Sequence, residues 1–231
     1  MTLNTILDNQ LWEAHHLLKM APGVMLDCRM TIIRLDDDTL MMHSPVPISE
    51  AMKQQIEDLP GTLKYVIAPS LFHHLFVHNA KEMFPSVHTF AAPGLPKKRP
   101  NFTFDTELSF DDNSSLPWHT HLQAIPLKGM PKVNEVLFYH HATKTLIVTD
   151  LLFNMHTIHG AMSPLIFRMF GTYKRLAQSR LVKTAISDKN AYLTSIAPIK
   201  DLDIQRLIMA HGEVIEGPDT GSKVLQALGI S

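Results

Sequence analysis

Four apolar segments of the chain are each followed, directly or within a few residues, by residues that can bind a metal ion or exchange a proton. These residues are His43, the pair His73 and His74, Asp150, and His211. Imidazole nitrogens and carboxylate oxygens are common ligands of zinc, iron and manganese. Loops that leave the carboxyl ends of strands converge on one edge of an α/β fold. The pattern therefore predicts that these positions meet at one site.

The apolar segments must be strands for this prediction to hold. Residues 63–68 read as a buried strand, residues 72–84 as a helix, and residues 87–91 as the next strand. This strand, helix, strand order favours a parallel crossover. Ser49 has the type and position of an N-cap for a helix that runs to about Asp58.

Two hairpins are expected on either side of this crossover. Residues 29–35 alternate and pair with residues 39–43, and residues 135–140 pair with residues 145–149. Further along, Ser163-Pro164 predicts a helix start, and apolar residues from Leu165 to Ala177 share one helical face.

The last predicted elements are a helix over residues 188–196, a buried strand over residues 204–210 and a short helix over residues 224–228. Two mixed sheets covered by helices account for this order of elements. The sequence thus predicts an α/β (α+β) fold, a four-layer αββα sandwich that forms a single domain over residues 1–231.

Several segments together resemble the metallo-β-lactamase superfamily, in which the chain looks like a divergent bacterial branch. The segments that carry the resemblance are residues 29–35, 43–47, 72–76, 92–95, 134–138, 149–154 and 210–212. The superfamily's zinc motif, H-x-H-x-D-H, falls here on Pro69, Leu71, His73 and His74. The first two ligands are therefore missing, and a histidine replaces the aspartate.

The remaining ligand positions of the resemblance are kept only in part. No histidine occurs near residues 129–131, where the family has its loop histidine. Asp150 matches the metal-bridging aspartate and His211 the terminal histidine, while His43 stands where an aspartate is usual. The resemblance implies that the first metal position is lost and that His73, His74, Asp150 and His211 hold at most one zinc, iron or manganese ion.

Two functions follow from this reduced site, and the sequence does not choose between them. In the first, the protein is a metal-dependent hydrolase of a small-molecule substrate, with Asp150 as ligand or base. In the second, no metal binds: Asp150 accepts hydrogen bonds from His74 or His211, and the protein is a non-catalytic protein that binds a small molecule or a partner. Histidine acid–base chemistry without metal is a third reading.

Composition limits the partners and the cellular setting. The chain has 231 residues and a net charge of −1, so no basic excess exists to hold a nucleic acid. Its one cysteine, Cys28, cannot form an internal disulfide, which fits a reducing compartment. The sequence contains neither a signal peptide pattern nor an apolar span. It therefore predicts a soluble, cytoplasmic protein without a membrane partner.

Overall fold

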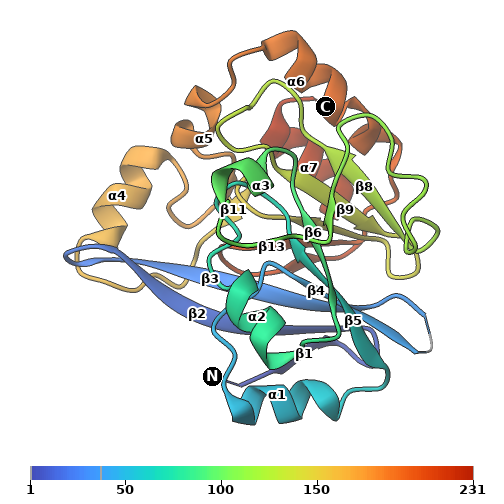
Figure 1. The fold of residues 1–231 in the computed structure, drawn as a ribbon. Coiled ribbons are helices and arrows are strands. Elements are labelled where there is room, and N and C mark those ends of the chain that lie inside the picture. Colours follow the sequence, from blue (N-terminus) through green and yellow to red (C-terminus); the bar gives the residue numbers. More distant parts are fainter. Residues whose placement is uncertain (1, 37, 231) are drawn as a thin grey trace. The chain divides into compact units, whose positions relative to one another are not determined.

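The computed structural model describes residues 2–36 and 38–230 (Figure 1). The contacts within the chain group it into two compact units. Unit 1 takes in Met1–His16 and Arg29–His121, and unit 2 takes in Leu17–Cys28 and Leu122–Ser231. The long strands β2 (Leu11–Ala21) and β3 (Val24–Arg34) therefore contribute residues to both units. The prediction of a single domain stays a prediction.

Unit 1 is built around a mixed sheet in which the strands follow one another in chain order, from β1 to β7. β3 and β4 form the predicted antiparallel hairpin, whereas β4, β5, β6 and β7 run parallel. The predicted parallel crossover is therefore confirmed. Besides β2 and β3, the strands are β1 (Asn4–Leu7), β4 (Thr39–His43), β5 (Thr62–Ala68), β6 (His88–Ala91) and β7 (Thr106–Glu107).

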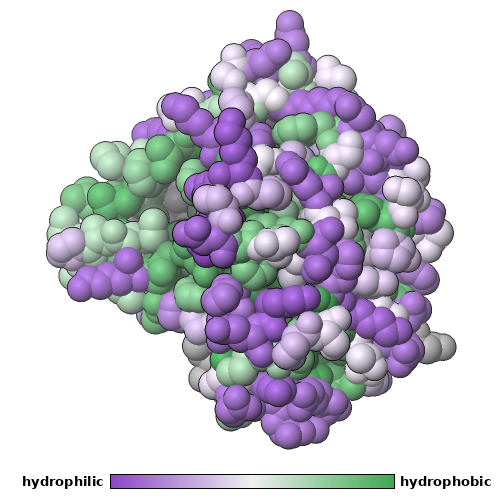
Figure 2. Space-filling model, viewed as in Figure 1, coloured by the Kyte–Doolittle hydropathy of each residue, from purple (hydrophilic) through white to green (hydrophobic). Residues whose placement is uncertain are grey.

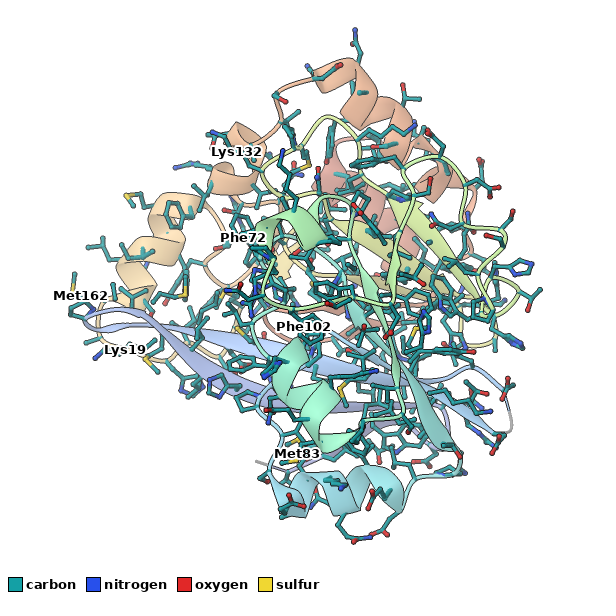
Figure 3. The ribbon with its side chains drawn as sticks, in the orientation of Figure 1. Lys19, Phe72, Met83, Phe102, Lys132 and Met162 are labelled. Carbon is teal, nitrogen blue, oxygen red and sulfur yellow. The ribbon has the colours of Figure 1, made fainter. Side chains whose placement is uncertain are left out.

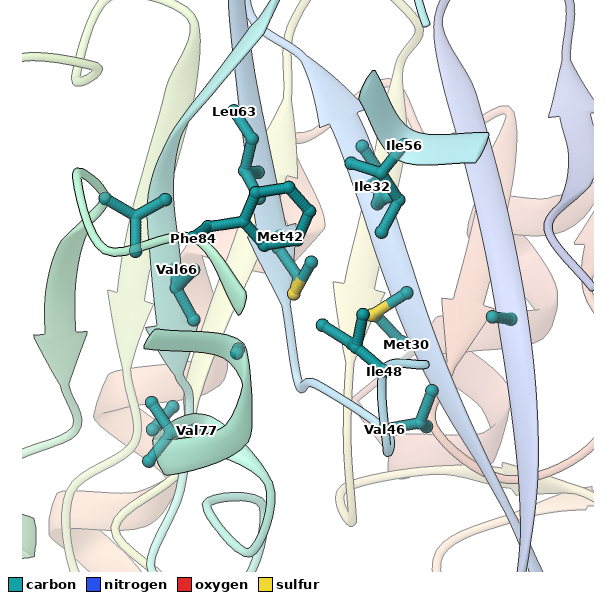
Figure 4. Close-up of a cluster of buried hydrophobic side chains, with 14 of the residues drawn as sticks. Met30, Ile32, Met42, Val46, Ile48, Ile56, Leu63, Val66, Val77 and Phe84 are labelled. Carbon is teal, nitrogen blue, oxygen red and sulfur yellow. The ribbon is translucent and has the colours of Figure 1, made fainter. Parts of the chain in front are cut away.

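Two helices bury their apolar faces against this sheet. Met52 and Ile56 of α1 (Glu50–Glu57) and Val77 of α2 (Val77–Met83) belong to one cluster with alternate residues of the strands. Figure 4 shows the side chains of this cluster, among them Met30, Ile32, Met42 and Val66. Full burial of each such side chain contributes about 1.5–3 kcal/mol to folding.

The starts of these helices test two sequence predictions. Ser49 caps α1 as predicted, because its hydroxyl accepts a hydrogen bond from the Met52 amide at 3.3 Å. The second helix begins at Val77, five residues later than predicted. The Ser70 hydroxyl accepts from the amides of Phe72 and His73 as a cap would, but the Leu71 carbonyl accepts from the Lys98 side chain and residues 73–76 form a turn instead of a helix. A third helix, α3 (Leu95–Lys98), follows β6.

An ion pair in unit 1 makes the stability of the fold depend on pH. The Arg29 side chain is buried and donates to the Glu13 carboxylate at 2.6 Å, and His15 lies 3.4 Å from the same oxygen. Burial alone would raise the pKa of Glu13, but the hydrogen bonds and charges of His15 and Arg29 outweigh it and hold that pKa below 4.5. The pair therefore stabilises unit 1 above pH 4.5 and loses this effect as the pH falls through the lowered pKa.

We expect Glu13→Gln to lower the free energy of unfolding by about 2 kcal/mol at pH 7, because it leaves the buried guanidinium without its carboxylate. Urea unfolding of both proteins between pH 7 and pH 3 should show this difference shrinking below about pH 4.5. Glu57→Gln is the matched control, since Glu57 is half exposed and lies 4.0 Å from Lys53. A difference that stays constant down to pH 3 would contradict the assignment.

Unit 2 contains a second mixed sheet with the strand order β14-β13-β10-β9-β8. β9 and β10 form the second predicted hairpin, and β10 pairs in parallel with β13. β11 and β12 form a separate pair. The strands are β8 (Leu122–Pro126), β9 (Val136–His140), β10 (Thr145–Val148), β11 (Phe153–Asn154), β12 (Leu176–Ala177), β13 (Arg206–Met209) and β14 (Ile215–Glu216).

The helices that follow β12 bury their apolar side chains against this second sheet. Ile196 and Val224, for example, cluster with Leu146, Val148 and Leu207 of the strands. These helices are α5 (Arg180–Thr184), α6 (Lys189–Ile196), the 3-10 helix η1 (Ala197–Asp201) and α7 (Thr220–Leu228).

The helix predicted from Ser163 is shorter than its apolar pattern indicated. α4 (Ser163–Phe170) starts where predicted, but Gly171 follows it in a left-handed conformation and ends it. Ser163 does not act as the cap, because its hydroxyl bonds to the backbone of Met25 instead. Within the described part of the chain, no helix has the length and apolar composition needed to span a bilayer.

Candidate functional site

Strand register in unit 2 brings Asp150 and His211 together. β10 and β13 are parallel neighbours, with Val148 opposite Met209. Asp150 and His211 each lie two residues beyond this matched pair, so both leave the sheet at the same level. The His211 Nε2 atom lies 3.4 Å from an Asp150 carboxylate oxygen, and both side chains are largely buried. The predicted meeting of these two strand ends is confirmed.

The His211 ring is oriented by three neighbours within unit 2. Its Nδ1 atom lies 2.7 Å from the backbone carbonyl oxygen of Asp27, which can only accept, so Nδ1 carries a proton and donates. The Phe153 ring stacks on it at 5.1 Å. Nε2 is thereby directed at Asp150. A backbone carbonyl on the second ring nitrogen is a usual feature of histidines that bind metal.

The charge state of this pair follows from its surroundings. Burial lowers the pKa of His211, but hydrogen bonding and charge from Asp150 and Cys28 outweigh that effect and raise it to about 10. Neutral His211 would place a lone pair against a carboxylate, which is unfavourable. The pair is therefore stable with either a proton or a metal cation at Nε2.

The buried carboxyl group of Glu135 fixes the backbone of Asp150. Glu135 is fully buried, and its carboxyl oxygens accept hydrogen bonds from the amides of Thr149 and Asp150. Burial, and then the negative charge of Asp150, raise the pKa of Glu135 to about 8, while the amide hydrogen bonds only partly offset them. Two acidic groups in one buried place favour a nearby cation.

The chain after His211 requires glycine. Gly212 has a φ of 101°, and a Cβ atom there would lie 2.2 Å from the backbone oxygen of Asn154. The Asn154 amide bonds to the His211 carbonyl at 3.2 Å, and its side chain donates to the Glu213 carbonyl at 2.9 Å. Asn154 thus stabilises the turn and holds β11 against residue 212.

His73 and His74 belong to unit 1, in the turn between β5 and α2. The sequence predicted that both histidines lie on a helix. They lie before it, because α2 starts only at Val77. His73 is partly exposed, and its Nδ1 atom lies 2.8 Å from the Ser44 hydroxyl. Ser44 itself takes a positive φ of 54° directly after β4. Of the two ring nitrogens of His73, Nδ1 is thus the one that contacts Ser44.

His74 has a different environment. It is buried, and its Nδ1 atom lies 3.3 Å from the Arg99 guanidinium, which can only donate. Its proton is therefore on Nε2. Burial and the positive charges of Arg99 and Lys98 lower the pKa of His74 to about 4. These contacts make His74 a less suitable ligand than His73.

The surroundings of His43 and of the basic run 97–99, both in unit 1, indicate structural roles. His43 is fully buried, and burial together with the charge of His73 lowers its pKa to about 3, so it is neutral. In the basic run 97–99, Lys98 donates to the Leu71 carbonyl and lies over the Phe72 ring, while Arg99 contacts His74. Two of the three cations in this run therefore hold the turn after β5.

Two residues beside the Asp150 and His211 pair were missed by the sequence reasoning. The sequence pattern placed Glu135 only in a strand. An acidic residue directly before a run of apolar residues is the signal that could have identified it. Cys28 was considered only for disulfide formation, yet it is half buried and contributes to the raised pKa of His211. No local pattern marks Cys28, because β3 and β13 are distant in the chain.

Solved structures with similar folds are metallo-β-lactamases. VMB-1 aligns over 99% of this chain and 95% of its own, with a TM-score of 0.67 and 12% identity. The metallo-β-lactamase from Pontibacter korlensis aligns over 100% and 99%, with a TM-score of 0.65 and 13% identity. FIM-1 from Pseudomonas aeruginosa, in its mono-zinc form, aligns over 99% of this chain and 94% of its own, with a TM-score of 0.62 and 15% identity. The predicted αββα fold class is confirmed.

Sequence comparison places the chain in a family without assigning an activity. No curated protein matches the chain in sequence. One family model matches residues 8–165, a stretch that includes β2 to β10, Glu135 and Asp150 but ends before His211. With the fold of the metallo-β-lactamases and this match over more than half of its length, the chain belongs to the family described as Domain of unknown function (DUF4336).

Proposed function

We propose that the protein binds one metal ion through Asp150 and His211 and acts as a metal-dependent hydrolase on a small molecule. The observation that carries this proposal is the orientation of His211. Its Nδ1 proton is engaged by the Asp27 carbonyl, and its Nε2 atom faces the Asp150 carboxylate. An imidazole nitrogen and a carboxylate oxygen that face each other in a buried place form half of a typical zinc or iron site.

The donor set fits one ion better than two. Unit 2 supplies two ligands, Asp150 and His211, and protein sites for zinc usually have three or four. The sequence motif supplies His73 and His74 as the further candidates, and the contacts of each favour His73. The positions that would hold a first metal carry Pro69 and Leu71, which have no ligand atoms in their side chains. FIM-1, which has a similar fold, has been solved in a mono-zinc form.

The residues of the site have separate tasks in this proposal. A bound ion would supply Lewis-acid polarisation of a carbonyl or phosphoryl oxygen and activation of water. Asp150 would bind the ion or accept a proton from the nucleophile. Glu135 would hold the Asp150 backbone through two amide hydrogen bonds, and Phe153 would keep the His211 ring in place.

Metal analysis of protein purified without an affinity tag tests the proposal. We expect about one equivalent of zinc, iron or manganese per chain, and we expect His211→Ala and Asp150→Asn to reduce it to background. His73→Ala should lower the metal content more than His74→Ala, because Arg99 contacts His74. His159→Ala is the matched control, since His159 is an exposed histidine of the same unit.

The result of this experiment also separates the proposal from a second candidate function. Burial lowers the pKa of His211, but hydrogen bonding and charge from Asp150 and Cys28 raise it, which supports a pair held by a proton alone. A non-catalytic protein that binds a small molecule therefore remains the alternative. Protein that is free of metal, and whose unfolding temperature does not change with added zinc, iron or manganese, would favour this alternative and refute the metal proposal.

A further inference from the structure

Large apolar side chains are exposed on one part of unit 2. They come from the tip of the hairpin between β2 and β3, from α4 and from α5. We call this set the hairpin–α4 surface; its residues are Leu17, Met20, Met162, Leu165, Met169 and Leu181, which are 40–60% exposed. Figure 2 shows the apolar surface gathered over the hairpin tip and α4.

Backbone contacts hold the hairpin tip and α4 together. The Met162 amide donates to the Gly23 carbonyl at 2.8 Å, and the Met25 amide donates to the Ser163 hydroxyl at 3.0 Å. Figure 3 shows Met162 next to the end of the hairpin that carries Lys19. The hairpin tip and the start of α4 therefore lie side by side, and their exposed apolar side chains share one part of the surface.

α4 exposes the face that an amphipathic helix normally buries. Met162, Leu165 and Met169 are spaced at i, i+3 and i+7 and lie on one side of the helix. The inward face holds Ser163 and Phe167, which are buried. The apolar periodicity of this segment, which predicted a core-facing helix, thus covers an exposed face as well.

The two chain segments that form this surface carry only positively charged side chains. From residue 151 to residue 187 the chain contains no aspartate or glutamate, and residues 17–26 contain Lys19 as their only charged residue. The exposed cations of the first segment are Arg168, Lys174, Arg175, Arg180 and Lys183. The whole chain has a net charge of −1, so this concentration of cations is local.

The end of α4 keeps two of these cations beside the apolar side chains. The Arg180 guanidinium donates to the Met169 carbonyl at 3.0 Å, and the Arg175 guanidinium donates to the Gly171 carbonyl at 2.7 Å. Both groups thus bind carbonyls at the carboxyl end of the helix, where cations are favoured. The cations border the apolar row instead of extending away from it.

From this combination we infer that the hairpin–α4 surface binds the surface of an anionic lipid bilayer. Exposed leucine and methionine side chains enter the boundary between headgroups and acyl chains, and the surrounding lysines and arginines bind anionic headgroups. A second copy of the chain is a poorer partner, because two surfaces of the same positive charge repel each other. Methionine side chains are flexible, which suits a fluid surface.

This inference is separate from the proposed metal site, and it differs from the sequence-based expectation of no membrane partner. That expectation rested on the lack of an apolar span, which concerns crossing a bilayer. Binding at its surface requires only a short apolar face with adjacent cations.

Co-sedimentation of the full chain with lipid vesicles tests the inference. We expect the protein to bind vesicles of phosphatidylcholine that contain about 30% of the anionic lipid phosphatidylglycerol. Binding should be weaker in high salt, and vesicles of phosphatidylcholine alone should bind little protein. Leu165→Gln with Met169→Gln should weaken binding roughly tenfold or more. Lys19→Gln with Lys183→Gln should weaken it about 30-fold.

Matched controls use residues of the same unit outside this surface. Leu193→Gln removes an exposed leucine from α6, and Lys189→Gln with Lys200→Gln removes two exposed lysines; both should bind as the wild type does. Circular dichroism and metal content should be unchanged in every variant. Equal binding by the surface variants, or no binding to anionic vesicles, overturns the inference. The inference is also overturned if the protein does not bind vesicles but instead self-associates or binds an acidic peptide, and Leu165→Gln abolishes that interaction.

Discussion

Replacing Gly212 with alanine is expected to lower the free energy of unfolding by about 4 kcal/mol. The new Cβ atom would lie 2.2 Å from the Asn154 oxygen and 2.8 Å from the Met155 nitrogen, both of them backbone atoms. The φ of 101° adds strain for any residue with a side chain. Thermal unfolding should therefore show a midpoint about 10 °C lower.

Gly229 provides the control that separates the clash from the strain. It also has a positive φ, 69°, but no atom lies within 4 Å of its added Cβ. Gly229→Ala should therefore cost only about 1 kcal/mol. Equal losses in the two variants would mean that the contact between Gly212 and β11 does not hold this turn.

Glu135→Ala is expected to cost about 3 kcal/mol, because it leaves the buried amides of Thr149 and Asp150 without an acceptor. It also leaves a cavity in a fully buried place. Glu135→Gln should lose less, since one side-chain oxygen remains to accept one of the two amides. Urea unfolding at a fixed pH measures both differences.

The control for this series is Glu216→Gln, which changes an exposed carboxylate of the same unit that pairs with Arg206. It should change stability by no more than about 0.5 kcal/mol. A role of Glu135 in positioning Asp150 further predicts that Glu135→Gln keeps more bound metal than Glu135→Ala. If both variants unfold like the wild type, the amide contacts are not important to the fold.

The pattern of apolar segments was enough to predict the elements that carry the site. The strands that precede His43, Asp150 and His211, the two hairpins and the Ser49 cap are present as predicted. These features depend on local alternation, on turn residues and on side chains that bond to their own backbone. Such interactions lie within a few positions of one another, so the sequence contains them directly.

The helix boundaries show where local patterns were insufficient. Residues 72–76 carry an apolar helical pattern, but the Leu71 carbonyl accepts from the side chain of Lys98, 27 positions further along the chain. Ser163 has the type of an N-cap, but its hydroxyl bonds to Met25 of a strand far away in the chain. In both cases a polar group had two possible partners, and a contact with a distant residue decided which one it took.

The sequence by itself determined that Asp150 and His211 each follow a buried strand, and its resemblance to the metallo-β-lactamase superfamily implied that only part of a two-metal ligand set is present. Only the tertiary structure decided that Val148 pairs with Met209, and this register brings the two side chains to 3.4 Å. It also decided that Glu135, Asp27 and Cys28 surround them. Strand register and burial arise from contacts between residues distant in the chain, and no local pattern of residue types encodes such distances.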